Sequence, residues 1–160
     1  MKSHIVRYLV PVLLGLLTVA CNQVKTDYYP NGNMRSAISM DGEHYHGLAK
    51  FYYEDGTLLM ECIYLSDSLD GTLIRYFETG ARKEKMSYKR NKPDGVYQQW
   101  NPQGQLLVEC SYSDSLLDGK YRAYHDNGQI KSSGQYTSGE PKGLWLFYDE
   151  NGYIVSKENY

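Results

Sequence analysis

The side chains of this sequence best suited to chemistry are two histidines in its N-terminal third, His44 and His46. They are two residues apart, so on a β-strand both imidazoles would point to the same face. Asp41 and Glu43 stand beside them, and imidazole and carboxylate groups are common ligands of zinc. A metal site would need a further ligand held nearby by the fold, and the sequence identifies none. We therefore interpret this segment as a polar connector and predict no metal site.

Two acidic segments, SDSLDG at residues 66–71 and SDSLLDG at residues 113–119, raise the question of calcium binding. Their acids lack the ligand spacing of an EF-hand loop, and aspartate favours turns because its carboxylate bonds to its own backbone. The sequence also contains no P-loop, no nucleophile elbow and no Cys-x-x-Cys pair. We therefore interpret both segments as turns and predict neither catalytic residues nor a cofactor.

The N-terminal 20 residues have the pattern of an export signal. Lys2 and Arg7 give a basic start, and residues 8–20 are apolar. The apolar stretch is shorter than the roughly 20 residues that a membrane span needs. The sequence LTVAC, which ends at Cys21, resembles the lipobox of bacterial lipoproteins. This resemblance implies cleavage after Ala20, acylation of Cys21 and a lipid-anchored place in the cell envelope.

Plain secretion stays open as the alternative, because Thr18 stands where lipoboxes usually have leucine. Asn22 is not the aspartate that retains some lipoproteins at the inner membrane, so we expect the outer membrane if the cell is Gram-negative. In both interpretations residues 1–20 form a signal peptide. Residues 21–27 would then be an N-terminal tether.

The charge of the chain excludes one class of partner. It has 17 Lys+Arg against 19 Asp+Glu, a formal charge of −2. Without Lys2 and Arg7 the exported chain keeps 15 basic residues against 19 acidic ones, a charge of −4. Nucleic-acid binding asks for a basic excess, so we expect no nucleic-acid partner.

A repeat of 24 residues runs through the rest of the sequence. Positions in each repeat are counted here from the first of its two regularly spaced glycines. These first glycines are Gly47, Gly71, Gly95, Gly119 and Gly143. An aromatic residue follows at position +5, a second glycine at +9 and, in five units, a tyrosine at +17. Such periodicity without insertions indicates a repeat architecture, packed mainly by 16 of the 17 tyrosines, all but Tyr8.

Turn signals divide each repeat into two strands. Pairs such as Asn31-Gly32 and Asn127-Gly128 accept the positive φ angles of hairpin turns. Asp70-Gly71, Asp94-Gly95 and Asp118-Gly119 are expected to form the other turns. The segments between turns have strand length and alternate in polarity. The sequence therefore predicts an all-β fold, an elongated twisted antiparallel meander of about six hairpins.

The segments GLWLFYDENGYIVSKENY and GKYRAYHDNGQIKSSGQYTSGEPKG resemble the MORN repeat in its bacterial MORN-2 variant. The resemblance covers residues 28–160 and implies one repeat domain used for binding or scaffolding. Bacterial proteins of this build are often labelled antitoxins of the YwqK family. Arg82 departs from the aliphatic residue of the pattern at +11, and the pairs Thr79-Gly80 and Gln103-Gly104 replace Asn-Gly.

One row of aromatic residues is a candidate binding surface. At position +2 the last three complete units have Tyr97, Tyr121 and Trp145. Without a bulge, the +2 and +5 rows face opposite sides of the sheet. Two strands per repeat would place successive rings about 10 Å apart, a spacing suited to sugar rings or an apolar partner surface. The alternative is that these rings pack on neighbouring side chains.

The remaining cysteines and the last strand also carry expectations. Cys62 and Cys110 occupy equivalent positions two repeats apart, hence about 19 Å apart at 4.8 Å per strand, too far for a disulfide. We expect free thiols. Lys157 and Glu158 lie on the terminal strand and would discourage pairing with another chain.

The sequence thus favours a non-catalytic envelope lipoprotein that binds a protein or glycan partner. An antitoxin or immunity-type protein that neutralises a toxin by contact is the alternative. An enzyme is a third hypothesis, for which the sequence supplies no residues.

Overall fold

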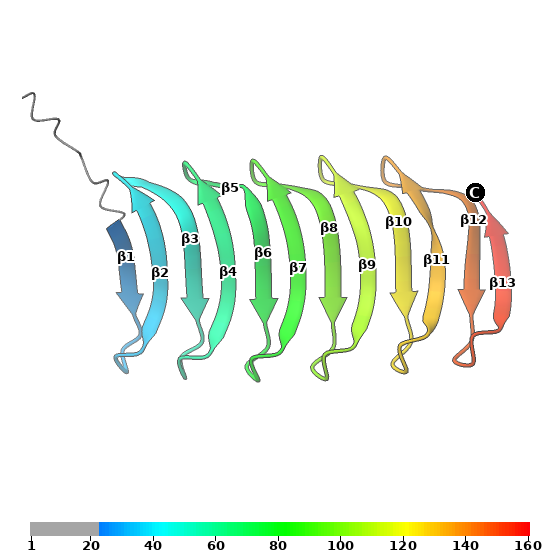
Figure 1. Ribbon diagram of the computed structural model, residues 1–160, viewed down its shortest axis with the longest axis horizontal. Helices are drawn as coiled ribbons and strands as arrows, with labels where there is room; N and C mark the ends of the chain where they lie inside the picture. The colour runs from blue at the N-terminus through cyan, green and yellow to red at the C-terminus, as the bar shows by residue number, and fades with distance from the viewer. Residues whose placement is uncertain (1–22) are drawn as a thin grey trace, which may run out of the picture.

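A computed structural model describes residues 23–160, which form one open antiparallel β-sheet (Figure 1). Its strands are β1 (Gln23–Tyr28), β2 (Met34–Asp41), β3 (His44–Tyr52), β4 (Leu58–Leu65), β5 (Ser68–Leu69), β6 (Gly71–Tyr76), β7 (Arg82–Lys89), β8 (Lys92–Trp100), β9 (Leu106–Ser113), β10 (Leu116–Tyr124), β11 (Ile130–Thr137), β12 (Glu140–Tyr148) and β13 (Ile154–Asn159). The predicted signal peptide and Cys21 lie outside the described residues. Within the described part, no helix is long and apolar enough to cross a membrane.

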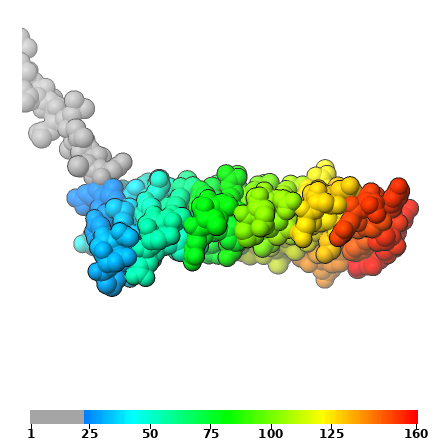
Figure 2. Space-filling model, turned by 90° about the horizontal axis from the view of Figure 1, so that it is seen from below, coloured from blue at the N-terminus to red at the C-terminus, as the bar shows by residue number. Residues whose placement is uncertain are grey.

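Each strand pairs with the next along the chain, apart from the two-residue β5, which pairs with β4 beside the main path. Six hairpins therefore follow one another across the described sheet, and Figure 2 shows the resulting elongated body. This arrangement confirms the predicted all-β meander. The predicted tether of residues 21–27 is wrong in its extent, because residues 23–27 belong to β1 and pair with β2.

The lower turns of Figure 1 contain the second glycine of each repeat. In the first of them the Gly32 N–H donates to the Tyr29 carbonyl at 2.9 Å, and Gly32 alone has a positive φ, +88°. Asn31 serves differently, since its side-chain oxygen accepts the Asn33 N–H at 2.9 Å. Thr79 replaces it with a longer bond of 3.4 Å to the Ala81 N–H. Where Gln103 stands at this position, the Asn101 side-chain oxygen accepts the Gln103 N–H at 3.1 Å instead, so the turn does not require asparagine.

The upper turns differ from the prediction. They are centred on Ser66-Asp67, Arg90-Asn91, Asp114-Ser115 and Ser138-Gly139, where both residues have positive φ. The Asp-Gly pairs lie about four residues later instead, at or inside the following strand.

The pair in β8 shows what an Asp-Gly dipeptide does there. Gly95 has φ +112° where the register between β7 and β8 shifts, and a Cβ on it would lie 2.9 Å from the Ser87 Cβ. Only glycine fits this bulge. The Asp94 carboxylate accepts the Asp114 N–H at 3.3 Å, so it ties β8 to the next upper turn.

The core lies on one face of the sheet. Its buried apolar residues are Ile38, Ala49, Cys62, Leu73, Cys110 and Trp145. We call this the core face, and the other side the opposite face. Tyrosine rings such as Tyr45 and Tyr64 cover the buried residues, with their centroids 5.5 Å apart. Cys62 and Cys110 are free and buried, as expected, and lie on strands β4 and β9.

Candidate functional site

One line of side chains crosses the core face from strand to strand. It consists of cross-strand neighbours at positions +2 and +15, most of which pair directly and therefore share a face. We call it the central row: Ile38, Ala49, Cys62, Leu73, Met86, Tyr97, Cys110, Tyr121, Gly134 and Trp145. It is aliphatic or small toward the N-terminus and aromatic toward the C-terminus.

The three predicted binding residues all lie in this row, but they are not equally accessible. Tyr97 and Tyr121 are half-buried, whereas Trp145 is only 5% exposed. The Tyr121 and Trp145 ring centroids lie 5.5 Å apart, much closer than the strand spacing suggested, because the rings lean together. Tyr136 packs edge-on against Trp145 at 5.1 Å. Trp145 therefore packs on its neighbours, and Tyr97 and Tyr121 keep ring surface open to a partner.

Gly134 explains why an indole fits at this point. A Cβ on Gly134 would lie 2.2 Å from the Trp145 ring, so the indole occupies the space of the missing side chain. The Trp145 Nε1–H donates to the Gln135 carbonyl at 3.3 Å. The sequence shows no reason for this glycine, since the register between β10, β11 and β12 is needed to place it beside Trp145.

Tyr97 and Tyr121, the partly exposed tyrosines of the row, present neutral phenols. Burial raises the pKa of Tyr97 and of Tyr121 above the ordinary value. Their hydroxyls therefore stay protonated at neutral pH and can both donate and accept hydrogen bonds. A flat ring with a polar rim suits both sugar rings and protein surfaces.

The +5 row lies on the opposite face, as parity predicted. The Tyr76 hydroxyl donates to Glu61 at 2.7 Å, and the Tyr124 hydroxyl donates to Glu109 at 2.8 Å. Burial, aided by the Glu61 carboxylate, raises the pKa of Tyr76 to about 12. Arg122 also binds Glu109, at 3.0 Å. These side chains bond to one another and stabilise the strands.

A shallow hollow on the opposite face was not found by sequence reasoning. It lies over β10, β11 and β12, and its lining includes Arg122, Ile130, Leu144, Leu146 and Tyr148. Its floor is open because small residues occupy β11. No repeated motif indicates this hollow, since the units of β4, β7 and β9 have Glu61, Lys85 and Glu109 where β11 has Ser133.

The histidine and acidic segments form ties between turns. His44 Nδ1 lies 2.6 Å from Asp67 Oδ2, and the Tyr45 N–H donates to the other oxygen of Asp67 at 2.7 Å. The hydrogen bond to His44 is the main cause that lowers the pKa of Asp67. Among residues 23–160, no group of three possible metal ligands lies together.

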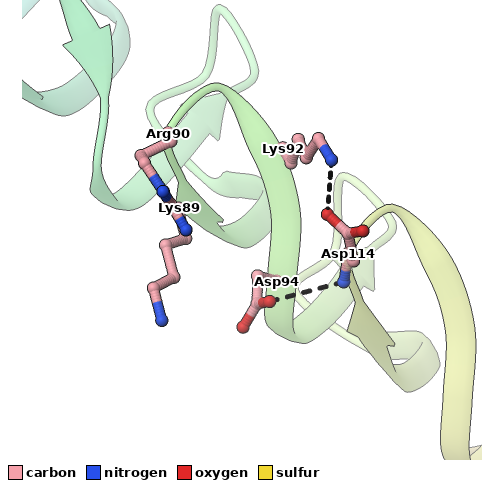
Figure 3. A pocket seen from close by; sticks show the side chains of 5 residues that line it. All are labelled: Lys89, Arg90, Lys92, Asp94 and Asp114. Atoms are coloured by element: carbon pink, nitrogen blue, oxygen red, sulfur yellow. Dashed lines mark hydrogen bonds and ion pairs between the residues drawn. The ribbon is translucent and has the colours of Figure 1, made fainter.

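A basic hollow lies between two upper turns (Figure 3). Lys92 Nζ lies 2.6 Å from an Asp114 carboxylate oxygen, and this contact lowers the pKa of Asp114. Asp94 binds the Asp114 N–H from below in the same view. Lys89 and Arg90 lie on the far side of the hollow. Exposed ion pairs of this kind contribute little stability, and they link neighbouring hairpins.

The register, the repeated glycines and the packed tyrosines define a repeat protein built from β-hairpins. Its chain matches the family described as MORN repeat variant at residues 45–65, 69–90, 93–114, 117–137 and 141–160, and it belongs to this family. MORN repeats are commonly interaction or scaffold modules. A comparison with curated proteins found no match to the chain.

Proposed function

We propose that the protein is an exported, non-catalytic lipoprotein of the cell envelope whose repeat sheet binds a protein or glycan partner. The observation that carries the binding role is the pair Tyr97 and Tyr121, two partly exposed neutral phenols in one row of the sheet. Rigid aromatic side chains of this kind are favoured anchors at interfaces. Trp145 is the buried member of the same row and packs against Tyr121.

The anchor part of the proposal rests on the LTVAC sequence and on where the sheet begins. β1 starts at Gln23, two residues after Cys21. A lipid on Cys21 would therefore hold the β1 end of the sheet close to the membrane surface. The remaining hairpins would present their faces to partners in the envelope.

The test compares partner capture by two matched variants in the native cells. The Tyr97→Ser and Tyr121→Ser double variant changes the core face, and the Leu144→Ser and Leu146→Ser double variant changes the hollow on the opposite face. Chemical cross-linking followed by mass spectrometry measures which proteins or glycans are captured. Melting curves show whether each variant is folded.

We expect capture to fall at least about ten-fold in the tyrosine variant, since two lost anchors cost more than the roughly 1.4 kcal/mol that a factor of ten requires. The leucine variant should capture normally. Loss of capture in the leucine variant alone would contradict the proposed surface. The variant pair Tyr97→Phe and Tyr121→Phe then separates hydroxyl contacts from ring contacts. If the captured partner is a toxin, the protein is of the immunity type.

A further inference from the structure

Among residues 23–160, no strand pairs with the outer edge of β1 or of β13, and both strands carry exposed apolar side chains. All six residues of β13 are exposed, and Ile154 and Val155 are 47% and 64% exposed. At the other end, Val24 and Tyr28 of β1 are 56% and 54% exposed. Proteins usually protect such edges, because free strand backbone pairs readily with another chain.

The two edge strands, β1 and β13, occupy positions of the 24-residue repeat that pair with each other inside the chain. β1 occupies the same repeat positions as β6, two periods before it, and β13 the same positions as β11, one period after it. Inside the chain, a strand of the β11 type is always followed by a strand of the β1 type, as β12 follows β11. We propose that β13 of one copy pairs with β1 of the next, so that copies of this chain associate head to tail.

The internal junctions give the register of this pairing. Where β9 meets β10, Val108 pairs with Ala123, Glu109 with Arg122 and Cys110 with Tyr121. The equivalent positions at the proposed junction pair Ser156 with Asp27, Lys157 with Thr26 and Glu158 with Lys25. The last pair stands in line with the central row and consists of opposite charges.

Both members of that charged pair already lie on the core face. Glu158 pairs with Trp145 and accepts the Tyr160 hydroxyl at 2.5 Å. Lys25 pairs with Ile38, and its Nζ lies 5.6 Å from the centre of the Tyr45 ring. Opposite charges directly across an antiparallel pair attract, and like charges repel. Within the chain, Arg122 and Glu109 show such a contact at a junction of the same kind, at 3.0 Å.

The lower turns supply a second complementary contact. Asn31 Nδ2 donates to the Glu54 carbonyl at 2.9 Å, and Asn127 Nδ2 donates to the Glu150 carbonyl at 2.7 Å. Each asparagine thus reaches the turn of the following repeat. Asn151 is the equivalent residue of the last turn, and the carbonyl it would reach in the same way is that of Pro30 in the next copy.

Apolar burial favours the same junction. Ile130 of β11 and Tyr148 of β12 line one hollow, so position +11 lies near position +5 of the following repeat. At the ends, these positions are Ile154 and Tyr28, both exposed in the single chain. The junction would cover them together.

The charges select this pairing over others. Pairing of β13 with β13 of another copy, with the core face kept on one side, would set Glu158 against Glu158 or Lys157 against Lys157 in the registers centred on these residues, whereas β1 sets Lys25 against Glu158. Because the two surfaces are different, the contact does not close on itself and gives an open series of copies. Glu158 thereby discourages unrelated strands while matching Lys25.

The test is a charge exchange in the full mature protein, kept in detergent and studied by sedimentation velocity over a range of concentrations. We expect the wild type to form dimers, trimers and longer species as concentration rises. Lys25→Glu or Glu158→Lys should each weaken association about five-fold, through one like-charge cross-strand pair. The double exchange should restore it to within about two-fold of wild type. Lys157→Glu, whose opposite residue is Thr26, is the matched control and should change association little.

Three outcomes would overturn the proposal. The first is a wild type that stays monomeric at all concentrations, with or without a strand of another protein bound at β13. The second is association that stops at a dimer. The third is a double exchange as weak as the single variants. All variants should melt as the wild type does, because both charged side chains lie at the edges of the sheet.

Discussion

Replacing Gly134 by alanine tests whether the Trp145 indole is seated on β11 as described. Gly134 does not have a positive φ, so alanine suits its backbone, and in a strand this change alone would stabilise by roughly 0.5–1 kcal/mol. The added Cβ, however, would lie 2.2 Å from the ring, where ordinary contact begins at 3.4 Å. The ring must move by the difference of 1.2 Å, which is overpacking and costs about 1–3 kcal/mol.

The displaced ring also strains its hydrogen bond to the Gln135 carbonyl, which is worth about 1 kcal/mol. The cost therefore exceeds the backbone gain, and we expect a net loss of about 1–2 kcal/mol in the free energy of unfolding. For a chain of this size that lowers the melting temperature by about 2–8 °C. Calorimetry measures it, and the emission of Trp145 reports on the movement of the ring.

The control and the rescue use neighbouring positions. Ser133→Ala, one residue away on the opposite face, should change stability by less than about 0.5 kcal/mol. In a Trp145→Leu background the smaller side chain leaves room, so Gly134→Ala should no longer destabilise, and the double-mutant cycle should show this coupling. A Gly134→Ala variant that is more stable than the wild type would refute the placement of the indole.

Four further predictions concern the anchor, the last repeat and two titrating groups. Cys21→Ser should move the native protein from the detergent phase to the aqueous phase, because several acyl chains hold a membrane where one is marginal, and an intact mass without lipid would contradict the anchor. Deleting residues 143–160 should lower the melting temperature and promote association through the exposed β11, as measured by calorimetry and light scattering. Burial raises the pKa of the Cys110 thiol to about 11, so its reaction with an alkylating reagent at pH 8 should be much slower than that of an unfolded control. The Tyr124 hydroxyl lowers the pKa of Glu109 below its ordinary value of 4.5, so this bond stabilises the fold above that value and is lost as pH falls through the lowered pKa; Tyr124→Phe should flatten the acid side of a stability–pH curve.

The order of the hairpins was predictable from the 24-residue repeat of the sequence. Residues at a fixed spacing of 24 must occupy equivalent places, so neighbouring repeats pair in one register throughout. The upper turns were misplaced because their residues share no type, as Arg90-Asn91 and Asp114-Ser115 show. Asp94-Gly95 has the composition of a turn, but its glycine is required by a bulge and its aspartate by the next hairpin.

The face of each row was predictable from parity, but its exposure was not. Sequence alone places Trp145 beside Tyr97 and Tyr121 as members of one row. Whether a ring stands free depends on what lies across the strand, and the space over Gly134 is visible only in three dimensions. The start of β1 at Gln23 was not predicted either. An edge strand with several polar residues has little of the apolar alternation that marks a strand in the sequence.

The composition of the central row separates stability from recognition along the sheet. In its N-terminal part, Ala49, Cys62 and Leu73 are at most 3% exposed and form a closed apolar core. In its C-terminal part, Tyr97 and Tyr121 stay partly exposed, whereas Trp145 is covered by its neighbours and by the space over Gly134. The partly exposed tyrosines therefore leave surface that a bound partner would cover, whereas Trp145 leaves almost none. Substitutions at Cys62 or Leu73 should therefore act on folding, and substitutions at Tyr97 or Tyr121 chiefly on binding.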